Sequence, residues 1–300
     1  MNYADRLDQA VRSKGNPCLV GLDPHLDLMP EEFAAVRDPQ ATRNECANEV
    51  TRFLIGILDA VADIVPAVKP QSAFFEVLGP EGLAAFESIV AASHERGLIV
   101  IGDAKRGDIG STAAAYAQAF LTGGPGSDPA TLCDALTVNP YLGSDSIQPF
   151  LEACDEADAG LYILARTSNP SSAEFQTQGT PTLAERVADA IGVWGAERIG
   201  TCGFSSVGAV VGATHPGELA ALRERMPHTP LLLPGFGAQG ATAADVVGGF
   251  TEGCRGALVN SSRGILFAYR NGGAPHWKDA AREAARQMAS ELALALASPA

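Results

Sequence analysis

Eight short apolar runs alternate along this chain with longer Ala-rich stretches of helical pattern, and polar, Pro or Gly residues follow each run. Such an alternation predicts parallel strands joined by helices, and eight repeats predict a closed (β/α)8 TIM barrel. A doubly wound open sheet is the alternative for the same pattern. The expected strands are residues 18–22, 64–68, 98–102, 135–138, 161–165, 207–212, 231–233 and 256–259. Helices are expected at, among others, residues 44–61, 82–96, 113–121, 184–194 and 217–225.

The chain has further helical stretches outside these repeats. Residues 3–13 are expected to cap the bottom of the barrel, and residues 277–297 to pack as a C-terminal helix on its outer ring. A length of 300 residues with 46% hydrophobic content is enough for one large core, so we expect a single barrel domain over residues 1–300. Residues 121–134 and 171–182 interrupt the pattern and are predicted to be irregular excursions, with no role indicated.

The composition disfavours several classes of protein. A net charge of −14 is unsuited to sequence-independent nucleic-acid binding. No apolar run reaches membrane-spanning length, and the N-terminus has no signal-peptide pattern. The six cysteines form no CxxC pair and are expected to be reduced thiols in a cytoplasmic protein. The five histidines form no HxH or HExxH pattern, so no metal site is predicted.

The most informative motif follows the third expected strand and reads Asp-Ala-Lys-Arg-Gly-Asp-Ile over residues 103–109. Residues two apart on a strand point the same way, so Asp103 and Lys105 should lie side by side, with Asp108 just beyond a turn. Acidic neighbours on both sides would keep Lys105 protonated. That favours a proton donor and electrostatic stabiliser over a Schiff-base lysine, which needs a depressed pKa.

Two more charged residues follow the first two expected strands, Asp23 and Lys69. In a barrel the carboxyl ends of the strands form the active-site face, so these side chains should join Asp103 and Lys105 in one alternating network. The alternative is a network of salt bridges that serves stability only. For Asp23 alone, Asp-Pro is also an ordinary turn signal.

A second group of residues follows the last two expected strands. Residues 234–240 read Pro-Gly-Phe-Gly-Ala-Gln-Gly and are expected to enter a helix, and Arg263 follows strand eight. Barrels often bind phosphate between these two loops through backbone N–H groups, and an Arg supplies a charge-assisted contact. The sequence therefore predicts a phosphate site there, although Gly-rich pieces also occur in ordinary turns.

These motifs together resemble those of the orotidine 5′-phosphate decarboxylase family. Residues 103–112 are similar to its DxKxxDI motif and the Thr that follows it, and Lys69 resembles the first lysine of its Lys-Asp-Lys-Asp set. Asp23 is similar to its ribose-binding Asp, residues 234–240 to its PGxGAQG loop, and Arg263 to its phosphate-binding Arg. The likeness covers most of the barrel and is nearest to a longer bacterial subgroup.

The resemblance implies a carboxy-lyase that converts orotidine 5′-phosphate to uridine 5′-phosphate, the last step of de novo UMP synthesis, with no metal and no organic cofactor. It implies a homodimer whose active sites share Asp108 and Thr112 across the interface. Rival interpretations are a metal-dependent sugar-phosphate decarboxylase or aldolase of the same superfamily, and an inactive nucleotide-binding barrel. The implied catalytic residues are Lys105, Asp103, Lys69 and Asp108, and the implied substrate-binding residues are Asp23, Thr112, Ser168, Pro234, Gln239 and Arg263.

Overall fold

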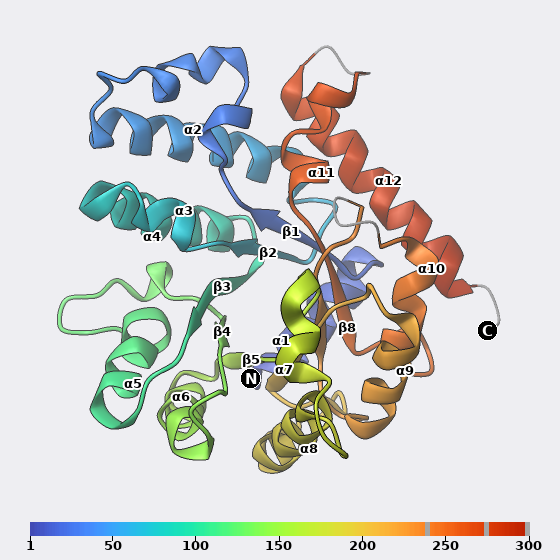
Figure 1. Cartoon of the computed structure of the whole chain (residues 1–300). Helices are drawn as coiled ribbons and strands as arrows, with labels where there is room; N and C mark the ends of the chain where they lie inside the picture. The colour runs from blue at the N-terminus through green and yellow to red at the C-terminus, as the bar shows by residue number, and fades with distance from the viewer. Residues whose placement is uncertain (238–240, 273–275, 298–300) are drawn as a thin grey trace.

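The computed structural model describes residues 1–237, 241–272 and 276–297, and its strands close into a barrel (Figure 1). Each strand is parallel to its neighbours, and pairing of Cys18 with Val259 closes the ring. This closure confirms the predicted (β/α)8 barrel and excludes the open sheet. The strands are β1 (Cys18–Leu22), β2 (Ala67–Pro70), β3 (Ile99–Arg106), β4 (Ala135–Val138), β5 (Gly160–Arg166), β6 (Val207–Val211), β7 (Leu231–Leu233) and β8 (Ala257–Ser261).

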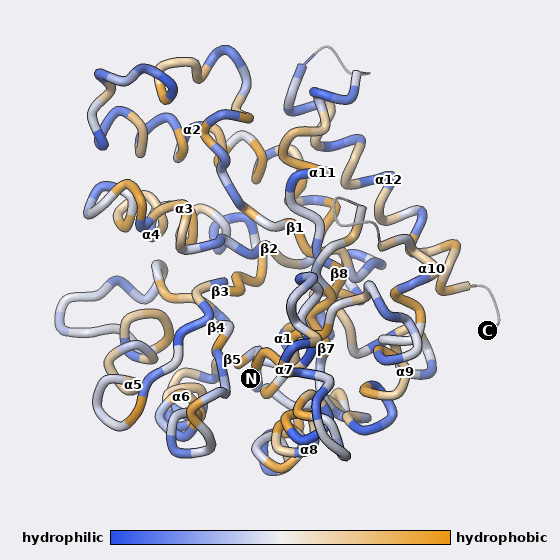
Figure 2. Tube along the Cα trace, in the orientation of Figure 1, coloured by the Kyte–Doolittle hydropathy of each residue, from blue (hydrophilic) through white to orange (hydrophobic). Residues whose placement is uncertain are grey.

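Helices surround the barrel (Figure 2), and their buried apolar side chains pack in one core with those of the strands. Local sequence fixes several of their ends. A capping box formed by Thr42 and Glu45 starts α2, and Thr182 and Glu185 form another at the start of α8. The α-helices are α1 (Tyr3–Lys14), α2 (Arg43–Val61), α3 (Ala73–Glu76), α4 (Gly79–Glu95), α5 (Gly110–Ala117), α6 (Ser144–Ala157), α7 (Ala173–Gln176), α8 (Leu183–Gly195), α9 (Pro216–Arg225), α10 (Ala243–Val246), α11 (Arg263–Leu266) and α12 (Trp277–Ala297).

The two extra helices lie where the sequence predicts them. Helix α1 closes one end of the barrel, where the ring of Tyr3 packs edge-on against Tyr162 at a centroid distance of 6.3 Å. Gly160 leaves the space for that ring, because a Cβ there would lie 2.3 Å from it. Helix α12 packs on α2, where the Trp277 ring lies over Gly56. Among the described residues, no helix is long and apolar enough to cross a membrane.

Four strands extend further into polar sequence than predicted, and β5 does so by one residue, to Arg166. Strand β2 includes Lys69, because it pairs with Gly21 of β1. Strand β3 runs through Lys105 to Arg106, whose carbonyl accepts a hydrogen bond from the N–H of Asn139. Strand β8 ends at Ser261 rather than at residue 259. The predicted ends were wrong because side chains at the mouth of a barrel are polar while the backbone ladder continues.

The two interrupting segments differ in character. Residues 121–134 are mostly irregular, as predicted, with one short 3₁₀ turn at Pro129–Thr131. The segment 171–182 is more ordered than predicted, because it contains the short helix α7. Figure 1 shows α7 in front of the centre of the barrel, at the end away from α1.

Candidate active site

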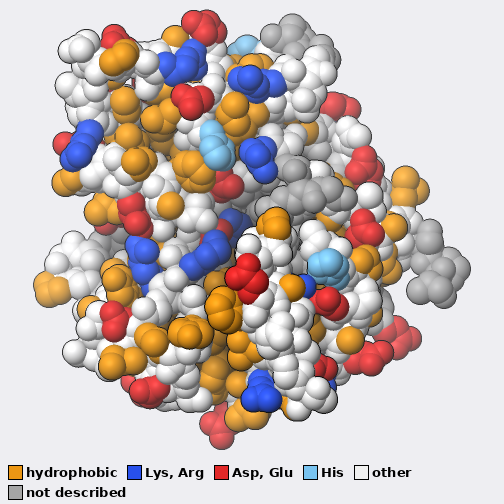
Figure 3. Space-filling view, in the orientation of Figure 1, with side chains coloured by type: hydrophobic (Ala, Val, Ile, Leu, Met, Phe, Trp, Pro, Cys, Tyr) orange, Lys and Arg blue, Asp and Glu red, His pale blue; other side chains and the backbone are white. Residues whose placement is uncertain are grey.

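A cavity of about 500 Å³ opens at the carboxyl ends of the strands. Figure 3 shows Lys and Arg side chains gathered at a hollow near the centre of this face, although the whole chain carries a net charge of −14. The cavity is lined by residues from or just after seven strands: Asp23, Lys69, Gln71, Asp103, Lys105, Leu164, Thr167, Ser168, Asn169, Val210, Leu232, Pro234, Gly235, Phe236, Asn260, Ser262 and Arg263. Thr137 of β4 and Gln176 of α7 complete it.

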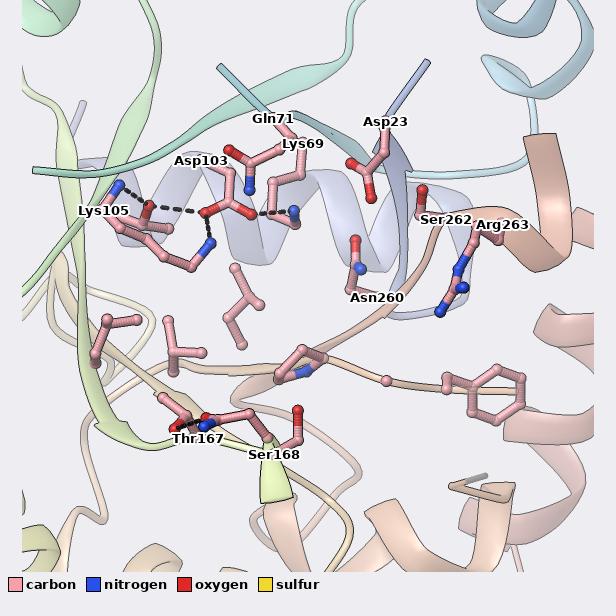
Figure 4. Close-up of a pocket in the computed structure, with 18 of the residues that line it drawn as sticks. Asp23, Lys69, Gln71, Asp103, Lys105, Thr167, Ser168, Asn260, Ser262 and Arg263 are labelled. Carbon is pink, nitrogen blue, oxygen red and sulfur yellow. Dashed lines mark hydrogen bonds and ion pairs between the residues drawn. The ribbon is translucent and has the colours of Figure 1, made fainter. Parts of the chain in front are cut away.

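The carboxylate of Asp103 lies between two lysines (Figure 4). Its Oδ2 pairs with Lys69 Nζ, and its Oδ1 accepts a hydrogen bond of 2.5 Å from Lys105 Nζ. The hydroxyl of Thr137 also donates to Oδ1, at 3.0 Å. Asp103 and Lys69 are each only 5% exposed, so neither charge could be buried here without the other.

Opposing effects set the charge states of this buried pair. Burial alone would raise the pKa of Asp103, but the charges of Lys69 and Lys105 and their hydrogen bonds hold that pKa well below its usual range. Burial alone would lower the pKa of Lys69, but the carboxylates of Asp103 and Asp23 outweigh it, and the pKa is raised. Both groups are therefore charged at neutral pH.

An irregular backbone brings Lys105 into the cavity. The pairing of β3 with β4 shifts register between Gly102 and Arg106, and Lys105 has a positive φ of 48°. The N–H of Lys105, turned out of the regular ladder, donates to the Thr137 hydroxyl at 3.0 Å. A positive φ is costly for a residue with a side chain, and such strain occurs mainly at functional sites. The side chain of Lys105 remains 45% exposed toward the opening.

A different set of polar groups lines the wall next to β1 and β8. Asp23 and Asn260 point into the cavity, with Ser262 and Arg263 farther along (Figure 4). Among the described residues, Oδ1 of Asp23, Oδ1 of Asn260 and Oγ of Ser262 are buried without a hydrogen-bond partner. Buried polar atoms are nearly always satisfied, so unpartnered ones facing a cavity are suited to a polar ligand.

The rest of the cavity is less polar. The side chains of Leu164, Val210 and Leu232 also line it. Thr167 and Ser168 of that loop lie across the cavity from Asp103 (Figure 4). An apolar surface with hydroxyl groups at its rim suits a flat, partly polar ring.

The structure brings together most of the residues that the sequence singled out. Asp23, Lys69, Asp103, Lys105, Ser168, Pro234 and Arg263 all line the one cavity. Asp108 and Thr112 do not line it: Asp108 Oδ1 accepts a hydrogen bond from its neighbour Ile109, and Thr112 is exposed on α5. Gln239 lies outside the described residues. In the described part of the chain, no three His, Cys, Asp or Glu side chains are grouped to hold a metal ion.

Comparison with known proteins agrees with this geometry. A sequence model described as orotidine 5′-phosphate decarboxylase / HUMPS family matches residues 20–274. The chain is 43% identical to the orotidine 5′-phosphate decarboxylase of Rhodopirellula baltica, over 97% of this chain and 99% of that protein. It is 42% identical to the protein of the same name from Deinococcus radiodurans, over 97% and 96%.

The chain belongs to the orotidine 5′-phosphate decarboxylase / HUMPS family. Solved structures agree: a putative orotidine 5′-phosphate decarboxylase from Streptomyces avermitilis has a TM-score of 0.80 at 39% identity, over 99% of this chain and 96% of the other. OMP decarboxylase from Leishmania donovani has a TM-score of 0.77 at 30% identity, over the full length of both chains. Neither the metal-dependent alternative nor the inactive barrel is favoured by these relatives.

Sequence reasoning missed several residues that line the site of this family member. Asn260 was expected in a loop after strand eight, but it belongs to β8 and is only 8% exposed. Thr137 gave no signal, because a single Thr in an apolar strand is ordinary. Gln176 lies in a segment with no predicted structure. Position along the strand is the signal that could have identified Thr137 and Asn260, since both lie at or next to the carboxyl ends of their strands.

We predict that the Asp103→Asn variant is less stable than the wild type by about 3 kcal/mol at pH 7, because buried Lys69 loses its closest counter-charge. The pKa of Asp103 is lower in the folded than in the unfolded chain, where it is about 3.9. Its stabilisation is therefore complete well above pH 4 and is lost as the pH falls below that value. Urea unfolding of both proteins should show a constant difference at pH 6–8 that narrows toward pH 3.

The matched control is Asp155→Asn, which removes an exposed carboxylate from its pair with Arg198. Its effect should be about 1 kcal/mol or less. An Asp103→Asn variant as stable as wild type at pH 7, or a difference that widens in acid, would contradict this account of the charge network.

Proposed function

We propose that this protein decarboxylates orotidine 5′-phosphate to uridine 5′-phosphate, with Lys105 as the proton donor. The observation that carries the proposal is the carboxylate of Asp103 held between Lys69 and Lys105 inside the cavity. Family membership supports the reaction, since curated relatives at 42–43% identity bear that enzyme's name.

The three parts of the substrate fit three regions of the cavity. Its phosphate binds Arg263, at the end farthest from Lys105, with help from the loop at 234–240. The ribose hydroxyls satisfy the buried oxygens of Asp23 and Asn260. The pyrimidine ring then lies over the apolar side chains, with its carboxylate beside Asp103 and its other edge toward Ser168.

In the chemical step the bond between C6 and the carboxylate carbon breaks, and CO2 leaves without the bonding electrons. The pair remains on C6, where Lys105 Nζ transfers a proton to it. The lysine, left neutral, regains its proton from water. Lys69 keeps Asp103 ionised and oriented throughout, and the carboxylate of Asp103 holds Lys105 Nζ in place at the cavity before the transfer.

Electrostatics of this kind can supply a large part of the acceleration. A unit charge about 4 Å from developing negative charge is worth about 4 kcal/mol at an effective dielectric constant of 20. That corresponds to roughly a thousandfold in rate. Binding of the distant phosphate supplies more, because it holds the ring against Lys105 and helps exclude water.

The proposal extends to a homodimer in which each site is completed by the partner. Asp108 and Thr112 do not line the cavity of their own chain, and Ile109 between them is 54% exposed. The neighbouring loop after β4 carries further exposed apolar side chains at Tyr141 and Leu142. An apolar surface at this edge of the mouth suits a second copy that contributes its acidic side chain.

We further propose that the enzyme works in the cytoplasm without a metal or organic cofactor. All six cysteines are free thiols, as a reducing compartment maintains them. The proposed step uses only the charges of Asp103, Lys69 and Lys105 and the proton of Lys105, all of which the chain itself supplies.

Replacing Lys105 by Ala should lower kcat by about a thousandfold or more, because both the proton and the stabilising charge are lost. The variant should still bind uridine 5′-phosphate, since the ribose and phosphate contacts remain. Turnover is followed by the absorbance of orotidine 5′-phosphate in the presence of EDTA, and binding by calorimetry. Lys278→Ala, on α12 and outside the cavity, should match wild type. Near-normal turnover by Lys105→Ala would refute the assigned role.

Mixing two inactive variants tests the shared site. Lys105→Ala and Asp108→Ala homodimers should each be almost inactive. In a mixed dimer one active site carries both substitutions and the other carries neither. If the subunits assemble at random, about half of the dimers are mixed, so the rate should recover to about one quarter of that of the wild type. The rate is measured after the two variants are unfolded and refolded together. If the mixture stays as inactive as its components while co-refolded wild type recovers, Asp108 does not act across an interface.

A further inference from the structure

Helix α7 places the side chain of Gln176, which has no part in the proposed reaction, at the active-site cavity. Gln176, the last residue of α7, lines that cavity and also a second cavity of about 230 Å³ between α7, α8 and α9. Its half-buried side chain therefore forms part of the partition between the two. The segment around it, residues 171–182, has no role in the chemistry described above.

Gln176 is hydrogen-bonded to Thr167, the first residue of the loop after β5. Its Oε1 accepts from the backbone N–H of Thr167 at 2.8 Å, and its Nε2 donates to the Thr167 hydroxyl at 2.8 Å. That hydroxyl in turn donates to Asn169 Oδ1 at 2.6 Å. One amide thus fixes both the backbone and the side-chain rotamer at the start of the loop.

The partners of Gln176 are themselves anchored. Arg166 is only 3% exposed and donates from Nε to Glu218 on α9 at 2.6 Å and from Nη1 to the Ser172 hydroxyl at 2.5 Å. The same Nη1 lies 3.4 Å from Gln176 Oε1, which biases that atom toward being the acceptor. Nη1 also donates to the Thr167 carbonyl at 3.0 Å. A buried guanidinium with these four partners holds α7 and α9 at fixed positions around the loop.

The end of β6 supports the loop from behind. A Cβ built on Gly212 would lie 2.9 Å from Ser168 Cβ and 3.0 Å from its backbone nitrogen. The loop is thus in contact with β6 on one side and tied to α7 on another. Thr167, Ser168 and Asn169 all line the cavity. Thr167 and Ser168 lie opposite Asp103 (Figure 4).

We infer that Gln176 is a positioning residue that fixes the 167–169 loop against the pyrimidine ring of the substrate, and so sets affinity for the base rather than for the ribose phosphate. The inference rests on the proposed function, which places the ring between Lys105 and this loop. A loop released from Gln176 would have to be ordered again each time the ring binds, which weakens binding of that part alone.

The test compares two ligands on three variants. Gln176→Leu removes both hydrogen bonds at similar size, and Gln176→Glu keeps the acceptor for Thr167 N–H beside Arg166. Gln178→Leu is the matched control, because Gln178 is exposed on the same segment and its side-chain amide donates to the Ala173 carbonyl rather than to the loop after β5. Dissociation constants for uridine 5′-phosphate and for ribose 5-phosphate, which lacks the base, are measured by calorimetry, with kcat and KM for orotidine 5′-phosphate.

Gln176→Leu should weaken uridine 5′-phosphate binding and raise KM at least tenfold, while ribose 5-phosphate binding stays within twofold of wild type. Gln176→Glu should recover most of the loss, and Gln178→Leu should match wild type. Unchanged uridine 5′-phosphate binding by Gln176→Leu, or equal loss for both ligands, would overturn the inference. Failure of the proposed function appears elsewhere, as absence of turnover by the wild-type protein.

Discussion

The contact of one buried carboxylate with two lysines organises this site. Asp103 could not stay ionised at 5% exposure without Lys69, and Lys69 could not stay charged at the same depth without Asp103. Neighbouring strands β2 and β3 supply the two groups, so the barrel itself fixes their separation. While Oδ2 of Asp103 pairs with Lys69, its Oδ1 is free to hold Lys105 at the cavity. A cation there can stabilise negative charge that develops on a bound substrate.

The other polar groups of the cavity come from different strands around the open end of the barrel. The unsatisfied oxygens of Asp23, Asn260 and Ser262 lie in or just after β1 and β8, and Arg263 begins α11 directly after them. The loop with the hydroxyl groups follows β5 on the far side. Gly21 illustrates how closely these walls approach, since a Cβ there would lie 2.8 Å from Ser262 and 3.1 Å from Asn260. Short α7 and buried Arg166 then stiffen the loop that the strands alone would leave unsupported. In the proposed function, the phosphate, the ribose and the ring are therefore recognised by different elements.

The fold was readable from the sequence because the strands of a parallel barrel are continuously apolar. Residues 18–22, 135–138 and 231–233 were predicted with the bounds that the structure has, since each is buried on both faces and ends at a polar or Pro residue. The charged end of β3 was not, because the positive φ of Lys105 and its bond to Thr137 arise from contact with β4. Gln176 was missed for a similar reason, because its hydrogen bonds go to Thr167 in the preceding loop and not to its immediate neighbours.

The central claim is that the ammonium of Lys105, held by Asp103, stands beside C6 of the pyrimidine. A crystal structure of the protein with uridine 5′-phosphate bound tests this directly. The account predicts Lys105 Nζ within about 4 Å of C6, the range over which its charge has the required effect, with Asp103 still in contact with both lysines and the phosphate on Arg263. A bound nucleotide whose ring lies away from Lys105, with that side chain pointing to solvent, would contradict it.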